Sequence, residues 1–151
     1  MPLIKSTLEN GLKKMQKSPP SSLVDASAQW ANAFFSYFSP ALAAGSTNQP
    51  ALNVATLTAL FLKSMTAGTF MDQLPSDLNT WLATAAWVGP GTGVGVIGAP
   101  LVVLPVKQAA LNSADYDFAK GLASQVHSWA GTLTVSITNV ATGVTTVVPL
   151  A

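Results

Sequence analysis

Residues 132–150 read TLTVSITNVATGVTTVVPL, and this stretch decides the fold class. Apolar residues alternate with serine and threonine over 133–137, which is typical of a strand with one buried face. After a turn at 141–143 that ends in glycine, valines recur from 144 to 148. The stretch therefore predicts an antiparallel β-hairpin. Because two strands alone are marginally stable in water, we expect this hairpin to pack on helices or to pair with strands of another molecule.

Five segments before this tail place apolar residues at helical spacing. They span 6–17, 23–38, 50–67, 77–88 and 112–130. We therefore predict an α+β fold with about five α-helices followed by a C-terminal antiparallel β-hairpin. At 151 residues the chain is expected to form a single domain, with a helical part over 1–130 and the hairpin over 131–151.

Serine and acidic residues mark where several of these helices are expected to begin. Ser6 and Ser22 are each followed three positions later by an acidic residue, Glu9 and Asp25, which is the spacing of a capping box. The candidate N-caps, in chain order, are Ser6, Ser22, Ser76 or Asp77, and Asn112 or Ser113.

The composition is poor in charge. Charged residues make up 9% and hydrophobic residues 49% of the chain, with a net charge of +1. A soluble domain averages about 25% charged residues, so we expect much of this surface to meet protein or lipid. The sequence has no arginine and no strong positive field, which argues against a nucleic-acid partner.

The second predicted helix, 23–38, is the most aromatic element. Phe34 and Phe35 are neighbours, about 100° apart on a helix, so the apolar face is wider than one core contact needs. The same spacing also suits burial within the chain's own domain. The candidate partner contacts are Trp30, Phe34, Phe35, Tyr37 and Phe38, together with Val135, Ile137 and Val147 in the hairpin.

The stretch GVGVIG at 93–98 has the glycine spacing of a dinucleotide-binding loop. Such a loop needs a strand directly before it and a helix directly after it. Here a segment with helical spacing precedes the glycines, and Ala99 and Pro100 with a β-branched run follow them. We expect the glycines to allow close backbone packing or an extended course, and we expect no cofactor.

Other candidate reactive residues are few. The single histidine, His127, lies in the fifth predicted helix, and no motif supplies the acid and nucleophile that a triad needs. Asp115 and Asp117 are two positions apart, so they are expected to point to different sides of that helix and to favour its first turn. With six scattered acids, one histidine and no cysteine, the chain is expected to have no catalytic or metal site and no small-molecule substrate.

A membrane role is the alternative to assembly. Residues 78–106 contain no charge and are long enough to cross a bilayer, but they include five glycines and three prolines. These residues would leave backbone groups unpaired in hydrocarbon, so we do not expect a spanning helix. A membrane-interacting protein would instead use the Gly/Pro-rich apolar segment 86–106 as a wedge.

The order of these elements resembles that of small virion structural proteins of tailed bacteriophages. The stretches that carry the resemblance are STLENGLKKMQ, AQWANAFFSYF, GPGTGVGVIGAP and SWAGTLTVSITNVATGVTTVV. The resemblance implies a non-enzymatic subunit of the tail, baseplate, neck or capsid surface, present in several copies in a virion that is assembled in the host cytoplasm. Its implied partners are copies of itself and other virion proteins.

Overall fold

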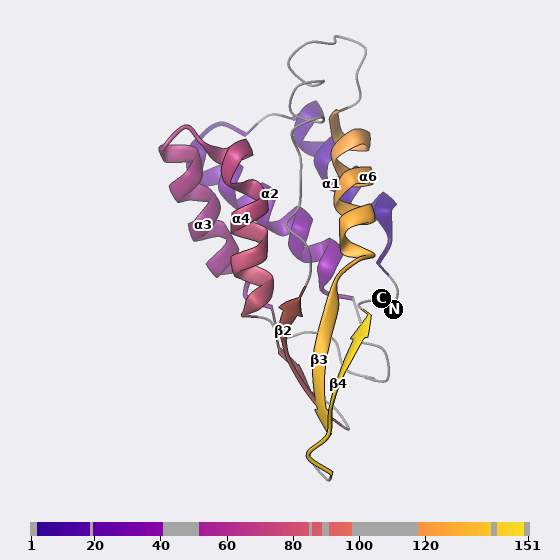
Figure 1. Ribbon diagram of the computed structural model, residues 1–151. Coiled ribbons are helices and arrows are strands. Elements are labelled where there is room, and N and C mark those ends of the chain that lie inside the picture. Colours follow the sequence, from indigo (N-terminus) through magenta and orange to yellow (C-terminus); the bar gives the residue numbers. More distant parts are fainter. Residues whose placement is uncertain are drawn as a thin grey trace.

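A helical body and a four-stranded sheet make up the computed structural model (Figure 1). The structure describes residues 3–18, 20–40, 52–84, 86–88, 91–97, 118–139 and 142–149. The helices are α1 (Lys5–Lys17), α2 (Leu23–Phe38), α3 (Val54–Thr66), α4 (Phe70–Ala83) and α6 (Phe118–Ala130). The strands are β1 (Ala86–Val88), β2 (Gly91–Ile97), β3 (Thr134–Asn139) and β4 (Thr145–Pro149).

The two predicted capping boxes have different outcomes. The Ser22 cap is confirmed, since the backbone N–H of Asp25 donates to Ser22 Oγ at 3.1 Å. The prediction for Ser6 is wrong, because α1 begins at Lys5 and no side chain caps it. Glu9 instead accepts a hydrogen bond from Lys13 Nζ at 2.7 Å, an i,i+4 ion pair on the helix surface.

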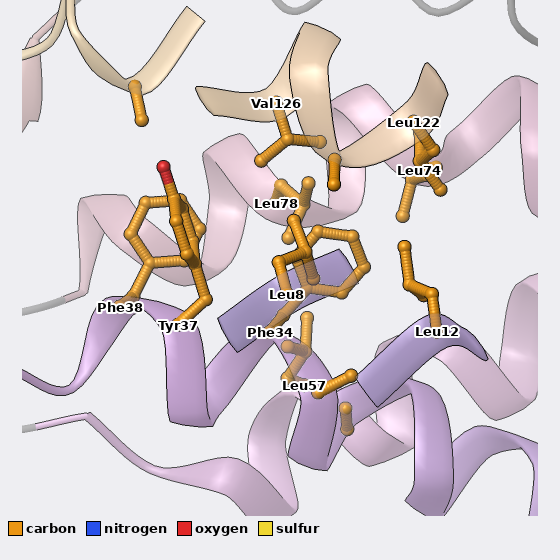
Figure 2. Packing of buried hydrophobic residues seen from close by; sticks show 14 of the residues in the cluster. Leu8, Leu12, Phe34, Tyr37, Phe38, Leu57, Leu74, Leu78, Leu122 and Val126 are labelled. Atoms are coloured by element: carbon orange, nitrogen blue, oxygen red, sulfur yellow. The ribbon is translucent and has the colours of Figure 1, made fainter. Parts of the chain in front are cut away.

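The core lies between the helices. α1 packs against both α6 and α2, and α2 packs against α3, which in turn contacts α4. Figure 2 shows Leu8 and Leu12 of α1 pointing toward side chains from the other helices. Gly11 lets α1 approach α2 closely, because a Cβ at this position would lie 3.1 Å from Ala33 Cβ. The fully buried large side chains are Leu8, Leu12, Phe34, Tyr37, Phe38, Leu57, Phe61, Leu74, Leu78, Trp81 and Leu82.

The predicted bounds of the fourth helix are wrong at both ends. α4 begins at Phe70 rather than near Asp77, although Pro75 lies inside it. An interior proline costs a helix about 3 kcal/mol, so packing must stabilise this first part. The Phe70 ring meets Trp30 at 4.9 Å and Phe61 at 5.1 Å between centroids, and Leu74 is fully buried. These contacts come from distant parts of the chain and outweigh the local signal.

The predicted fold class is wrong in its β part. Residues 86–88, predicted as helix, form β1, and the glycine-rich residues 91–97 form β2. The sheet order is β1-β2-β3-β4, and each neighbouring pair is antiparallel. The β structure is therefore not a C-terminal hairpin that simply follows the helices, because two of the four strands precede α6. β1 and β2 supply the additional strand pairing that an isolated pair of β3 and β4 would lack.

The sheet extends away from the helical body at the end of α6 (Figure 1). α6 passes through a turn at 131–132 into β3, and the buried Leu133 ties this junction to the core. α4 contacts β2. Because β4 is the last strand in the sheet order, it lies at the edge of the sheet, next to β3.

Candidate interaction surface

The β4 edge is the candidate interaction surface, defined here as Val144 to Pro149. β4 is the last strand in the sheet order, and in the described part of the chain only β3 lies beside it. Val144 is 59% exposed and Val147 is 61% exposed, while Thr146 between them is also exposed. Because successive strand residues point to opposite faces, both faces are open along Thr146 and Val147. Two large apolar side chains therefore face solvent.

This edge has few of the features that keep edge strands from pairing. Natural edge strands are blunted by charged side chains, prolines, bulges or a covering element. Residues 132–149 contain no charged residue. Pro149 is the one proline in the strand, and it stands at the end of β4. The β4 edge is thus neutral and rich in β-branched residues, a composition that favours pairing with another strand.

The structure places the predicted aromatic contacts of α2 in or against the core. Phe34, Tyr37 and Phe38 are at most 1% exposed, so these three rings are not accessible to a partner. Trp30 and Phe35 are half-buried and pack against the same core. The physical reason is that α2 contacts α1 and α3 and that its rings also reach α4 and α6. The wide apolar face is used within the chain.

Phe38 shows how far this packing extends. Its ring meets Tyr37 at 4.8 Å, Trp81 of α4 at 6.1 Å and Trp129 of α6 at 6.4 Å between centroids, all edge to face. Such aromatic pairs stabilise a core beyond the burial of their area. The aromatic residues therefore bind the helices to one another.

The predicted hairpin contacts have two outcomes. Val135 and Ile137 lie in β3, in register with Val148 and Thr146 of β4. Val147 lies in β4 in register with Ser136, and its side chain is exposed. Of the predicted contact residues whose burial the structure describes, Val147 is the one that remains accessible at a sheet edge.

His127 takes part in a hydrogen bond between helices. Tyr37 Oη lies 2.7 Å from His127 Nδ1, and the two rings are 6.0 Å apart, edge to face. Burial raises the pKa of Tyr37 well above its ordinary value, so the hydroxyl stays protonated. The protonated hydroxyl can donate to Nδ1 or accept from an Nδ1–H group, depending on the tautomer of the ring. The Tyr37 hydroxyl holds α2 to α6, and its full burial keeps it from a substrate.

Sequence reasoning missed a second polar pair, between α3 and α4. Ser64 Oγ donates to Asp77 Oδ2 at 2.7 Å, and both residues are buried. Burial raises the pKa of the Asp77 carboxyl, while the Ser64 hydrogen bond and the charge of Lys63 oppose that rise. In the sequence Asp77 is one of two candidate caps, with Ser76, so only the periodicity of α3 and α4 could suggest that Asp77 faces Ser64.

A cavity of about 620 Å³ lies between α1 and α2. Its polar lining residues are Thr7, Lys14, Ser18, Gln29, Asn32 and Ser36, and Gly11 and Ala33 also line it. The Gln29 and Asn32 amide groups already donate hydrogen bonds within α2, to Asp25 and to the Ala28 carbonyl. These two amide groups are therefore already engaged within α2.

The remaining predicted sites are placed as follows. Gly93 lies in β2 opposite Trp87 of β1 and Ile137 of β3, and Gly95 lies where the β2–β3 register is irregular, between Val94 and Ile97. Gly98, Asp115, Asp117 and the segment 98–106 lie outside the described residues. Within the ranges that the structure describes, no three metal-ligating side chains gather into a possible ion site. In those same ranges no helix combines the length and the apolar character needed to cross a bilayer.

Comparisons of the chain with protein-family models, with curated proteins and with solved structures give no match.

Proposed function

We propose that this chain is a non-enzymatic structural subunit of a tailed-bacteriophage virion, located in the tail, the baseplate, the neck or the capsid surface. Several copies would assemble by strand addition and apolar contact with one another and with other virion proteins. The observation that carries the proposal is the β4 edge, which is neutral, exposed on both faces and flanked by one strand in the described part. Strand addition to such an edge is a common mode of protein recognition.

The distribution of charge supports an assembly role. None of the seven lysines and six acidic residues lies in β1, β2, β3 or β4. A sheet without charged side chains gains little hydration free energy from facing water, and it loses little of that free energy when a partner covers it. The sheet is therefore the part of the molecule best suited to a protein interface.

The buried polar groups support a structural role in the same way. Tyr37 and His127 satisfy each other between α2 and α6, and Ser64 satisfies Asp77 between α3 and α4. Groups that a catalyst would keep available are here used to join helices. The resemblance to small phage virion proteins gives the proposal its biological setting.

The location can be tested by immunogold electron microscopy. An antibody raised against the purified chain would be applied to purified particles of the phage whose genome encodes it. The proposal predicts gold at one regular place on intact virions. If the antibody detects the chain only in the soluble fraction of infected cells and puts no gold on particles, the chain is not a virion subunit.

A further inference from the structure

We propose that β4 pairs with β4 of a second copy, in an antiparallel arrangement whose two-fold axis passes by Val147. This pairing would join the two four-stranded sheets into one continuous sheet. The inference rests on the proposed assembly in several copies and names the surface and the geometry by which one contact forms.

The neutrality of the edge favours a second copy as the occupant. A partner with charged side chains at its edge would lose hydration there and find no opposite charge along residues 144–149. The same edge on a second copy carries threonine and valine and no charge. β-branched cross-strand pairs stabilise an antiparallel sheet, so the edge is complementary to itself.

The register follows from the length of the strand. β4 runs from Thr145 to Pro149, so its central residue is Val147. Full antiparallel overlap of two such strands places Val147 opposite the partner's Val147. Thr146 then lies opposite the partner's Val148, and Thr145 opposite the partner's Pro149. Any other register leaves part of the edge unpaired.

Pairing in this register covers the exposed apolar side chain at its centre. Val147, which is 61% exposed, would contact the partner's Val147 on the same face of the extended sheet. Residues directly opposite one another in an antiparallel pair have Cα atoms about 4.5 to 5.5 Å apart. Each copy thus shields the other's valine from water.

Pro149 limits the pairing to this stretch. Proline has no N–H group, so a strand pairing cannot continue through it with full hydrogen bonding. A two-fold contact also uses the same edge on both copies, so it closes at two and does not grow into a fibre through β4. Larger assemblies would need a further surface.

The pairing of two five-residue strands is small. Interfaces that bury less than about 1,200 Å² are typical of weak complexes, so we expect association to depend on concentration and to be strengthened within a particle. Solution tests therefore need a series that reaches high protein concentration.

Single-cysteine variants test the register directly, because the chain contains no cysteine. Val147→Cys would place two thiols across the two-fold axis, within the Cα separation of about 4.4 to 6.8 Å that a disulfide requires. Val144→Cys is the matched control, since Val144 is 59% exposed and Val147 61%. In the proposed register the two copies of residue 144 lie six strand positions apart, roughly 20 Å.

Under mild oxidation we expect a disulfide-linked dimer from the Val147→Cys variant, at least tenfold more than from the Val144→Cys variant. Equal cross-linking of both variants would indicate random collision and would overturn the proposal. An assembly detected by its mass in solution, with no Val147→Cys dimer, would overturn the β4 pairing while leaving the subunit role intact. Such an outcome would favour assembly of the copies through another surface of this chain. A chain that stays monomeric by mass would overturn both the β4 pairing and the proposed subunit role.

Discussion

At the scale of single residues, burial decides what a side chain does. Phe34 and Phe35 are neighbours in the sequence, yet Phe34 is fully buried and Phe35 only half-buried. Phe34 meets Phe61 of α3 at 5.9 Å between ring centroids. The two residues therefore offer a matched pair for separating a core role from a surface role.

Phe34→Ala is expected to lower the free energy of unfolding by about 3 to 5 kcal/mol, because a fully buried ring leaves a cavity when it is removed. Phe35→Ala should cost clearly less, since part of its ring is already in water. Urea unfolding followed by circular dichroism measures both. Equal losses for the two variants would contradict the placement of Phe34 in the core.

Tyr37→Phe is expected to lower the free energy of unfolding by about 0.5 to 1.5 kcal/mol at neutral pH, through loss of the hydrogen bond to His127. Because burial raises the pKa of Tyr37 above its ordinary value of 10.0, the unfolded chain ionises first as pH rises. Wild-type stability should therefore fall as pH rises above about 10. This loss should be smaller in Tyr37→Phe, and identical alkaline curves would contradict the assignment.

Asp77→Asn should change how stability depends on acid pH. Burial raises the pKa of Asp77 above 3.8, so the folded state holds its proton more tightly than the unfolded state. Wild-type stability therefore falls as pH rises from 3.8 to the folded pKa, and the cost stays constant above it. Asparagine avoids this cost and can still accept from Ser64, so the variant should gain stability relative to wild type between pH 3 and pH 7.

Ser64→Ala is the matched comparison for that measurement. It leaves the Asp77 carboxylate buried without its donor, so it should cost about 1.5 to 3 kcal/mol at pH 7. Its effect should be smaller at pH 3, where the carboxyl is protonated. If the change in unfolding free energy caused by Asp77→Asn is the same at pH 3 and pH 7, and the change caused by Ser64→Ala is also the same at both, Asp77 is not the titrating group.

At the scale of elements, local signals were predictable from the sequence and distant contacts were not. The Ser22 cap could be predicted because donor and acceptor lie three residues apart. The start of α4 could not, because Phe70 is held by rings from α2 and α3. Trp81 adds a further distant contact, since its Nε1–H donates to the Asn53 carbonyl at 2.9 Å.

The sheet shows the same division. Alternation over 133–137 predicts a strand there, but residues 86–88 continue the helical spacing of the preceding segment. β1 forms because Ala86, Trp87 and Val88 pair with Val94, Gly93 and Thr92 of β2, a partner that no local pattern identifies. The position of β4 at the edge depends on this order of strands. The exposed Val147 could be named from the sequence, but its accessibility could not.

Val147→Lys should weaken self-association by about tenfold or more. It would place like charges opposite each other at the two-fold axis, which is unfavourable in a cross-strand pair. The fold should be kept, because this side chain is 61% exposed, and circular dichroism checks that point. Val144→Lys is the control at similar exposure and should have a smaller effect. A Val147→Lys chain that associates like wild type would exclude pairing at this residue.

At the scale of the whole molecule, the chain is divided by polarity. Most apolar side chains of the helices pack inside, although Leu23 and Val24 of α2 are exposed. The helices also carry the charged residues that the structure describes. The sheet carries none of the chain's charges and ends in the exposed β4 edge. We infer that the low charge of the sequence reflects a neutral sheet made for contact with protein. The aromatic helix α2, in contrast, serves the core.

Sedimentation velocity across a concentration series tests the central claim, assembly of this chain in several copies, most directly. The single chain has a mass of 15.5 kDa. We predict that the mass rises with concentration to two or more copies and that Val147→Lys reduces this rise. A folded wild-type chain that sediments at 15.5 kDa throughout the series would contradict the account.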